Sequence, residues 1–458
     1  MFFFFLGYIV LSQKFKQILI SGMEFLQGTY SYSTATMFNN DREQDLEMKS
    51  KHLQSLDEST IVKTTQFDED DIIDCMDINR QPSLYHPLLK NHKVQRRPSV
   101  LPSEILQSSF PIEHTQEYES GFSRKEDCPD GTVPIYRTTK VQVENAKNIS
   151  RQMFHNIGRR STNSLSTNPD SHAIFLIKSY CLRGSQQVFL KVNETNRVRF
   201  YGAAGSGSVY ELNVGPGQSS STNIWIETGP PGPVNMLLAG WMGRVDFDKE
   251  DLNLDQDISE VNASRSINGD LYPRLFIYWS VDGGEKTGCY NLLCKGFIQV
   301  HPRIGPKSRI IPVSTIGGRT FEMKLLIYQD PMTGNWWLVI STRNEMLGYW
   351  PKELVPRLAK AATDVAWGGI SLAGKDGISP PIGSGRYPDG FYDRAAFFRD
   401  IKYLRKGLKQ VAPSDQDDVV EGVDKSGCYG LQNDKLTRSD YWGYRFAFGG
   451  PGGSTCKH

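Results

Sequence analysis

The sequence offers few side chains that could carry nucleophilic or metal-assisted chemistry. Beyond residue 170 the histidines are His172, His301 and His458, and His301 precedes Pro302 in a predicted surface loop. A Ser-His-Asp or Cys-His mechanism needs an imidazole beside its nucleophile. No Cys-x-x-Cys pair exists, which argues against a zinc ribbon or a thioredoxin site. The glycine-rich 449–452 segment contains Pro and is not followed by Lys-Ser or Lys-Thr, so it does not resemble a phosphate loop. Carboxylates remain as candidates for catalysis, and we expect neither a metal nor a cofactor.

Several tryptophans could line a groove or fill a core. They are Trp241, Trp279, Trp336, Trp337, Trp350 and Trp367. Because a tryptophan side chain buries a large apolar area, we favour the core for any one of them.

Predicted β-strands must hold these candidate residues in position. The apolar stretches 324–329 and 336–341 flank Asp330-Pro331-Met332-Thr333-Gly334, a turn sequence that predicts a β-hairpin. Bulky apolar groups occupy both faces of these strands, which indicates the interior of a packed sheet. Short apolar runs separated by Gly and Pro recur from about residue 172 to 456 and predict a large antiparallel β-sandwich. They include 173–177, 187–192, 198–202, 208–212 and 275–281. One amphipathic helix is predicted over 351–363, kinked or split by Pro356.

Composition limits the classes of partner. The 458 residues include 52 basic and 51 acidic side chains, for a net charge of +1. Such a balance supplies no global field toward nucleic acid or acidic lipid. The apolar residues 1–10 are too few to span a bilayer but suit the core of a secretory signal, so we predict export. A misassigned start codon is the alternative, and nothing in the sequence indicates an oligomeric state.

The chain divides into four predicted parts. Residues 1–22 are the predicted signal peptide, and residues 23–136 form a polar, Pro-interrupted pro-region with small α+β structure. Residues 137–170 are rich in Asn, Ser and Arg and contain Arg159-Arg160, so we predict an exposed linker that proteases can cut. Residues 171–458 form the β-sandwich. The fold class is therefore mainly β.

Several blocks of this sequence resemble the plant neprosin family. The segment 71–78 with Gln81-Pro82 and 86–92 resembles the activation peptide of that family, and 128–135 resembles its close. Four further blocks are similar to the neprosin catalytic domain: 288–297, 334–338, 348–351 and 449–452. The resemblance runs from about residue 65 to the end of the chain, with the blocks in the family's order.

The resemblance implies a secreted proenzyme with a β-sandwich peptidase domain that cuts next to proline. Two glutamates work there, one as a base on water and the other as an acid. This chain departs from the family pattern at both positions, where it has Leu238 before Ala239-Gly240-Trp241 and Ile370 after Gly368-Gly369. Met242 also replaces the Gln that usually follows the tryptophan. We therefore predict a catalytically degenerate protein and assign no catalytic residue, although the family consists of hydrolases.

The scaffold around these two positions is retained, so a groove for Pro-rich polypeptide is the predicted remaining function. The groove candidates are Gly240, Trp241, Tyr349, Trp350, Trp367, Gly368 and Gly369. The alternative is an active peptidase with relocated acids, such as Glu260 of the acidic 246–260 loop, Glu285 or Glu227.

Cysteine spacing and the resemblance together predict three disulfides, Cys75–Cys128, Cys289–Cys294 and Cys428–Cys456, with Cys181 left as a buried thiol. Asn148, Asn193 and Asn262 head glycosylation sequons.

Overall fold

The structure, a computed structural model, describes most of the chain beyond residue 57. The described residues are 58–67, 71–102, 120–123, 127–154, 185–194, 199–229, 233–243, 271–340, 344–435, 442–454 and 456. All of them except Glu58 belong to one compact unit, Ser59–His458. The predicted signal segment and the strand expected at 173–177 lie outside the described residues, as do Cys181, Asn262 and the acidic 246–260 loop.

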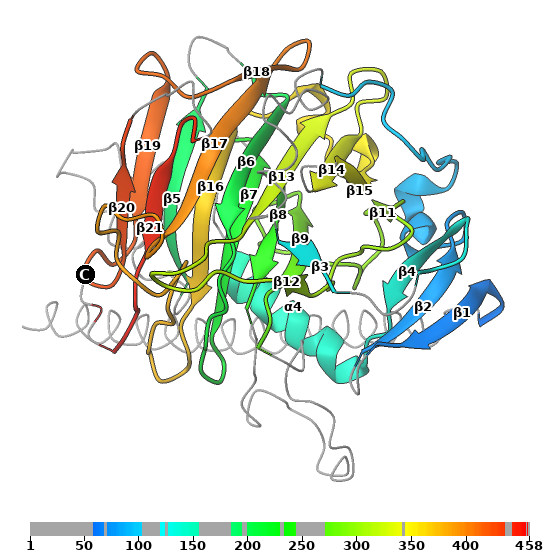
Figure 1. Cartoon of the computed structure of the whole chain (residues 1–458). Coiled ribbons are helices and arrows are strands. Elements are labelled where there is room, and N and C mark those ends of the chain that lie inside the picture. The colour runs from blue at the N-terminus through cyan, green and yellow to red at the C-terminus, as the bar shows by residue number, and fades with distance from the viewer. Residues whose placement is uncertain are drawn as a thin grey trace, which may run out of the picture. The chain divides into compact units, whose positions relative to one another are not determined.

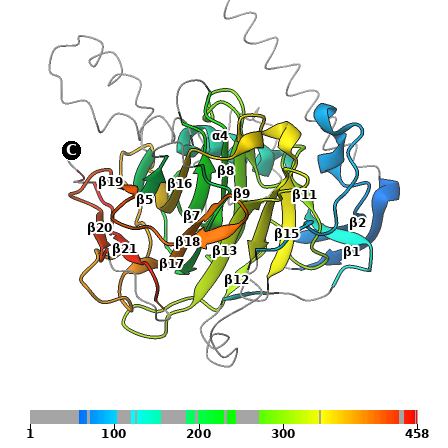
Figure 2. The same ribbon diagram turned by 90° about the horizontal axis from the view of Figure 1, so that it is seen from above.

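Two large antiparallel sheets form a sandwich (Figures 1 and 2). The seven-stranded sheet contains, in spatial order, β10 (Cys289–Tyr290), β9 (Arg274–Ser280), β8 (Met236–Met242), β7 (Ser219–Glu227), β16 (Asp364–Leu372), β5 (Ser185–Asn193) and β19 (Asp418–Val423). The second sheet runs through β11 (Ile298–Gln299), β15 (Glu345–Trp350), β14 (Trp336–Ile340), β13 (Glu322–Gln329), β6 (Gly202–Ser208), β17 (Ala396–Arg405), β21 (Phe446–Gly449) and β20 (Gly430–Asn433), with β18 (Lys409–Val411) on β17. The predicted antiparallel β-sandwich is confirmed.

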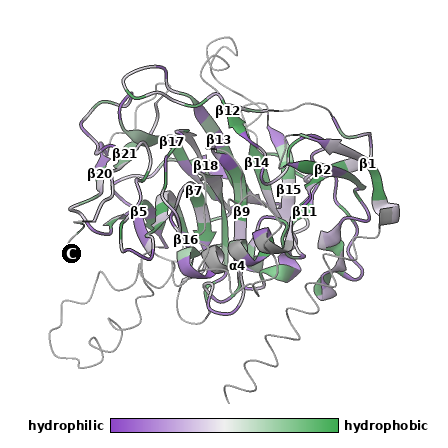
Figure 3. Cartoon of the chain, turned by 90° about the horizontal axis from the view of Figure 1, so that it is seen from below, coloured by the Kyte–Doolittle hydropathy of each residue, from purple (hydrophilic) through white to green (hydrophobic). Residues whose placement is uncertain are grey.

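The core between the sheets is apolar and rich in aromatic side chains. Hydrophobic colouring follows the strands of both sheets (Figure 3). The predicted hairpin is confirmed as β13 and β14, and it lies inside its sheet between β6 and β15. Trp336, Trp337 and Trp350 are fully buried there, as expected for strands that are apolar on both faces.

Neither β6 nor β7 was predicted, because the residues of these strands have low intrinsic preference for a sheet. The apolar runs predicted at 198–202 and 208–212 flank β6 and do not form strands themselves. β6 reads GAAGSGS and β7 begins with four Ser and Thr residues. Aromatic neighbours explain the glycines of β6: a Cβ at Gly207 would lie 2.6 Å from the Trp241 ring, and one at Gly202 would lie 2.9 Å from Tyr328 Cβ. Packing therefore overrides local propensity at these strands.

The predicted pro-region contains a small sheet and short helices. β1 (Ile61–Gln66), β2 (Ile72–Asp77) and β4 (Thr132–Tyr136) pair antiparallel, and β3 (Gly121–Phe122) pairs with β12 (Ile310–Ile311) of the sandwich domain. The 3₁₀ helices are η1 (Glu58–Thr60), η2 (Pro82–Tyr85) and η3 (Pro87–Leu89). The three predicted disulfides, Cys75–Cys128, Cys289–Cys294 and Cys428–Cys456, are all confirmed.

The predicted linker is wrong for residues 140–154, which form the helix α4 (Lys140–Phe154). This helix contacts β5, β10 and β16 of the seven-stranded sheet, and Figure 2 shows it beside that sheet. The predicted helix at 351–363 is also replaced. Two 3₁₀ helices, η7 (Lys352–Leu354) and η8 (Leu358–Lys360), lie on either side of Pro356, which cannot continue a helix.

Candidate functional site

Leu238 and Ile370 lie on the same face of the seven-stranded sheet. Side chains alternate along β8, so Leu237, Ala239 and Trp241 enter the core between the sheets, whereas Leu238 points to the opposite side. Ile370 of β16 points to that side too, and both side chains are fully buried. Met153 and Phe154 of α4 belong to the same apolar cluster. We call this side of the sheet the α4 face.

Strand register separates the two positions along this face. Ser221 of β7 pairs with Ile370 on one side and with Met242 on the other. Leu238 instead pairs with Trp225, four residues further along β7. At strand dimensions, this offset places the backbones of residues 238 and 370 about 16 Å apart, and those of 242 and 370 about 10 Å apart.

Met242, which follows Trp241 on β8, is therefore level with Ile370 across β7. Leu238 shares the face and the apolar cluster but is not a direct neighbour of Ile370.

Helix α4 fills this face with its last two residues. The Phe154 ring stacks on Tyr278 of β9 with centroids 4.3 Å apart and on Phe276 at 6.0 Å. The preceding residue, Met153, accepts a hydrogen bond at its carbonyl from Ser185 Oγ of β5, at 3.0 Å. In a flat sheet, β5 and β9 would lie about 19 Å apart. Two adjacent residues of α4 therefore contact both β5 and β9 and extend across the strands between them.

The floor beside Ile370 is polar but contains no carboxylate among the described residues. Gln187 of β5 pairs with Ile370, and Asn223 of β7 pairs with Gly368. Ser221 Oγ donates to the Ile370 carbonyl at 3.1 Å, and Asn223 Nδ2 donates to Ser221 Oγ at 3.0 Å. These groups can bind polar atoms of a ligand, but none of them can act as a general acid or base at ordinary pH.

An acid pair lies at the end of the same face. Lys191 Nζ is 2.7 Å from Glu227 Oε1 and 3.5 Å from Asp364 Oδ1, and all three residues are buried. Burial raises the pKa of Glu227, and the nearby Asp364 carboxylate raises it further against the opposing Lys191 ammonium. Burial disfavours the charge of Lys191, but the two carboxylates outweigh it and raise the pKa of that ammonium. The sequence alone ranked Glu227 low, because it could not show that Lys191 and Asp364 join it.

A second buried ionic cluster connects the pro-region to the α4 face. Arg274 of β9 pairs with Met242 and donates from Nη1 to Asp71 Oδ2 at 2.6 Å. Lys307 Nζ lies 2.9 Å from the other Asp71 oxygen. The Asp71 carboxylate is thus neutralised by two cations and is committed to holding the pro-region in place.

The other predicted acids do not join the site. Glu285 is exposed in the loop after β9, and Glu260 lies outside the described residues. Within the part of the chain that the structure describes, no three His, Cys, Asp or Glu side chains cluster as metal ligands, and no helix is long and apolar enough to cross a membrane.

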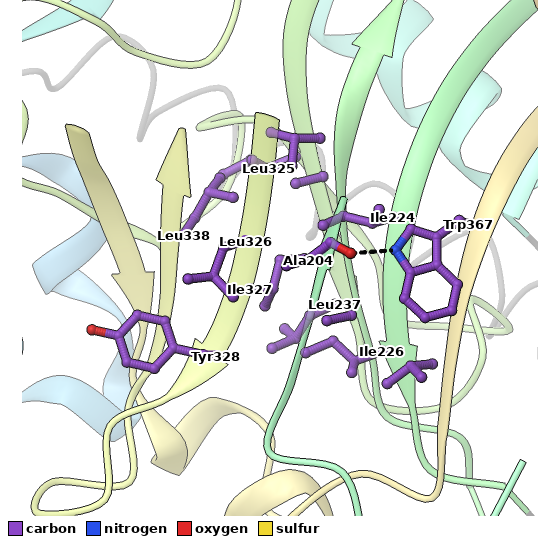
Figure 4. Packing of buried hydrophobic residues seen from close by; sticks show 14 of the residues in the cluster. Ala204, Ile224, Ile226, Leu237, Leu325, Leu326, Ile327, Tyr328, Leu338 and Trp367 are labelled. Atoms are coloured by element: carbon purple, nitrogen blue, oxygen red, sulfur yellow. Dashed lines mark hydrogen bonds between the residues drawn. The ribbon is translucent and has the colours of Figure 1, made fainter. Parts of the chain in front are cut away.

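The aromatic groove candidates do not lie on the α4 face. Trp241 and Trp367 are at most 3% exposed and enter the core between the sheets. Trp367 Nε1 donates to the Ala204 carbonyl of β6 at 3.0 Å (Figure 4), and Trp241 packs against Phe398 of β17. These tryptophans therefore do not line the α4 face.

The glycines are explained by close backbone approach. A Cβ at Gly240 would lie 1.9 Å from the Thr222 carbonyl oxygen and 2.8 Å from Asn223 Oδ1. A Cβ at Gly368 would lie 2.1 Å from the Val188 carbonyl oxygen, and one at Gly369 would lie 2.4 Å from Ile382. Gly240 and Gly368 thus let neighbouring strands pair closely beside Asn223.

Tyr349 and Trp350 are fully buried in the second sheet. The Trp350 ring packs against Phe297. The Tyr349 hydroxyl lies 2.8 Å from His92 Nε2 and accepts a hydrogen bond from the Gln95 amide at 2.9 Å. Tyr349 is therefore a contact of the predicted pro-region.

Asp330 in the β13–β14 turn anchors the same segment. It accepts hydrogen bonds from Gln95 Nε2 at 2.7 Å and from the Ser99 amide at 2.9 Å. Burial alone would raise the pKa of Asp330, but the hydrogen bonds from Ser99 and Gln95 outweigh it and lower that pKa. Burial lowers the pKa of His92, against the opposing Glu353 carboxylate.

Among the three asparagines that head glycosylation sequons, the side chain of Asn193 is described. Asn193 ends β5 and donates from Nδ2 to Asp418 Oδ2 at 2.9 Å, so a glycan there must replace this hydrogen bond. Asn148 lies within α4. Glycosylation remains a prediction.

Two family models match this chain, one over its N-terminal part and one over most of the β-sandwich. Residues 64–175 match the family model of the neprosin activation peptide, and residues 256–451 match that of neprosin. Helix α4 falls within the activation-peptide match. Among solved structures, scytalido-glutamic peptidase with a peptide-based transition-state analogue is 10% identical, with 58% of this chain and 97% of that chain covered and a TM-score of 0.28. SCP-B, an eqolisin-family peptidase in complex with the tripeptide Ala-Ile-His, is 8% identical over the same shares, with a TM-score of 0.24.

Proposed function

Since this chain belongs to the neprosin family, we propose that it is a secreted protein of peptidase ancestry that binds extended, Pro-containing polypeptide without cleaving it. The binding surface is the α4 face, and α4 covers it in the uncut chain. The proposal has two parts, the loss of proton-transfer chemistry and the retention of a peptide site.

The apolar environment of Ile370 is the observation that carries the first part. Ile370, Leu238 and Met242 are all buried in one hydrophobic cluster with Met153 and Phe154. Hydrolysis by a glutamic peptidase requires one group that takes a proton from water and another that delivers one. Hydrocarbon at these positions can do neither. A carboxylate brought in from a loop would have to displace well-packed side chains and would lose its hydration.

Retention of a peptide site rests on the composition of the same face. Apolar side chains surround Ile370, and Gln187, Ser221 and Asn223 supply amide and hydroxyl groups beside it. Apolar surface with a few fixed polar groups is the usual composition of a ligand site. Extended Pro-containing chains lose little conformational entropy when they dock on such a surface.

A second candidate is an active peptidase that uses Glu227 and Asp364. Both approach Lys191, and the pKa of Glu227 is raised by burial, which is how a carboxylic acid can be kept protonated for general acid catalysis. Against this candidate, Lys191 holds both acids in ion pairs, and Glu227 is 1% exposed, so no substrate atom reaches it in this conformation.

Two assays on the secreted chain, cut between α4 and β5 so that α4 can leave the face, separate the candidates. The first follows a fluorescein-labelled Ala-Pro repeat peptide by mass spectrometry from acidic to neutral pH, with wild type compared with Glu227→Gln. The second measures binding of the same peptide by fluorescence anisotropy. Binding without cleavage is the expected result. Cleavage that Glu227→Gln abolishes would favour the second candidate, and absence of both binding and cleavage would refute both.

A further inference from the structure

Three polar side chains lie beneath the end of α4, around Ile370. Gln187 is 2% exposed, Ser221 3% and Asn223 0%. Gln187 and Ser221 flank Ile370 directly on the two neighbouring strands, and Asn223 lies one step along the same face, opposite Gly368. Gly240 of β8 lies on the other side of Asn223, and a Cβ there would lie 2.8 Å from Asn223 Oδ1, so this oxygen lies over a residue without a side chain.

Two polar atoms of this group have no hydrogen-bond partner among the described residues. Asn223 donates to Ser221, which donates to the Ile370 carbonyl. Among the described residues, Gln187 Nε2 and Asn223 Oδ1 find no hydrogen-bond partner, although both atoms are buried. The face thus holds one free donor and one free acceptor on opposite sides of β16. Buried polar atoms are nearly always paired in native proteins, so these two atoms are available to hydrogen-bond a ligand that reaches the face.

Helix α4 does not supply the missing partners. Its side chains in the apolar cluster of this face are Ala146, Met153 and Phe154. Met153 accepts from Ser185 Oγ through its carbonyl and lies 3.3 Å from Ser219 Oγ through its sulfur, and Phe154 contributes only ring contacts to Phe276 and Tyr278. The helix covers the floor but leaves the donor of Gln187 and the acceptor of Asn223 unmet.

An extended polypeptide has the complementary groups. Each of its residues offers a backbone carbonyl, and each residue other than proline also offers an amide hydrogen. We propose that Gln187 and Asn223 anchor the main chain of an extended peptide that replaces Met153 and Phe154 on this face. Gln187 Nε2 donates to a peptide carbonyl, and Asn223 Oδ1 accepts from a peptide amide. This assignment rests on the proposed peptide-binding function and specifies how that site reads its ligand.

The assignment carries a rule about proline. A proline residue keeps its carbonyl, so it can occupy the position that meets Gln187. It lacks the amide hydrogen, so it is excluded from the position that meets Asn223. The favoured ligand is therefore a mixed sequence with proline and non-proline residues, not an uninterrupted run of prolines.

The test compares two labelled peptides of equal length, an Ala-Pro repeat and an oligoproline, on the secreted full-length chain. Anisotropy titrations use wild type and Phe154→Ala, a variant that loosens the cover. The Ala-Pro repeat should bind about five-fold or more tightly than oligoproline, as expected for one net hydrogen bond. Asn223→Leu should remove this preference, and Gln187→Met should weaken both peptides alike by a similar factor.

Thermal unfolding of the free variants supplies a second, independent readout. Removing an unpaired buried polar group should raise the melting temperature, so Gln187→Met should melt above wild type while it binds more weakly. Gln432→Met, on exposed β20 of the other sheet, is the matched control and should change neither property.

Two outcomes overturn the assignment. Equal affinity of Phe154→Ala for both peptides would show that no peptide amide meets Asn223, and a lowered melting temperature of Gln187→Met would show that the Gln187 side chain already has a partner. Failure of every peptide to bind wild type or Phe154→Ala, even after a cut between α4 and β5, would instead refute the proposed function itself.

Discussion

Replacing Ile370 with glutamate tests whether the α4 face can accommodate a carboxylate. The side chain is fully buried among apolar neighbours that include Leu372 and Met242. A carboxylate placed there loses its hydration and gains at best the amide donor of Gln187. A charge buried without a cation raises its own pKa by several units, and each unit costs about 1.4 kcal/mol. We therefore expect Ile370→Glu to lower the free energy of unfolding at neutral pH by about 3–5 kcal/mol.

The pH dependence of this loss separates charge from shape. The folded-state pKa of the new Glu is raised above its unfolded value of about 4.3, so the unfolded state binds fewer protons between these two values. Stability then falls as pH rises through that window, by up to about 1.4 kcal/mol per unit. Ile370→Gln has nearly the same shape but cannot ionise. The two variants should be equally stable at the acidic end and diverge toward neutral pH, whereas Ile370→Val should cost only about 0.5–1.5 kcal/mol throughout.

Urea denaturation followed by tryptophan fluorescence gives these free energies. If the Glu and Gln variants keep the same stability from acidic to neutral pH, the position accommodates an ionised carboxylate. The reasoning that this face no longer supports acid chemistry would then be wrong.

Three further predictions follow from contacts of α4 and the pro-region. Phe154→Ala should cost about 3–5 kcal/mol in urea denaturation, because it removes a fully buried ring, and hydrogen exchange should then be fast along α4; unchanged protection of α4 would contradict the packing described. Asp71→Asn should cost about 3–5 kcal/mol, because it removes the negative charge that Arg274 and Lys307 both contact in a buried cluster, and a loss below about 1 kcal/mol would show that the cluster is solvated. Because burial lowers the pKa of His92, the unfolded state binds more protons as pH falls through about 6.5. The thermal midpoint should therefore drop on acidification, and His92→Gln should reduce this drop; an identical drop in both proteins would exclude His92 as the group responsible.

The sequence predicted the features that are set by local chemistry. The β13–β14 hairpin follows from an apolar pattern and a turn sequence that act over neighbouring residues. Cysteine spacing and family resemblance together predicted all three disulfides. The resemblance singled out Leu238 and Ile370 but did not predict their arrangement, and the structure places both in one buried cluster.

Features that depend on distant partners were missed. β6 is a strand because Trp241 and Phe398 pack against it where only glycine fits, and no local signal contains that information. Residues 140–154 look polar and read as a linker, yet they form a helix whose end is held by Ser185 and Tyr278. Tertiary contact decides both segments.

Register within the site could not be predicted either. The sequence shows that Leu238 precedes Trp241, but only strand pairing shows that Met242, not Leu238, is level with Ile370. The same holds for the ion cluster, since Lys191, Glu227 and Asp364 come from three separate strands. A one-residue slip in pairing would reverse every side chain and destroy both arrangements.

The most direct measurement is turnover of a Pro-containing peptide by the secreted chain, before and after cutting between α4 and β5, across acidic and neutral pH. We predict that mass spectrometry finds the peptide intact in every sample, while anisotropy shows it bound once α4 is released. Cleavage next to proline that disappears when Glu227 or Asp364 is changed to its amide would contradict the account, because it would show that this face still exchanges protons with a substrate.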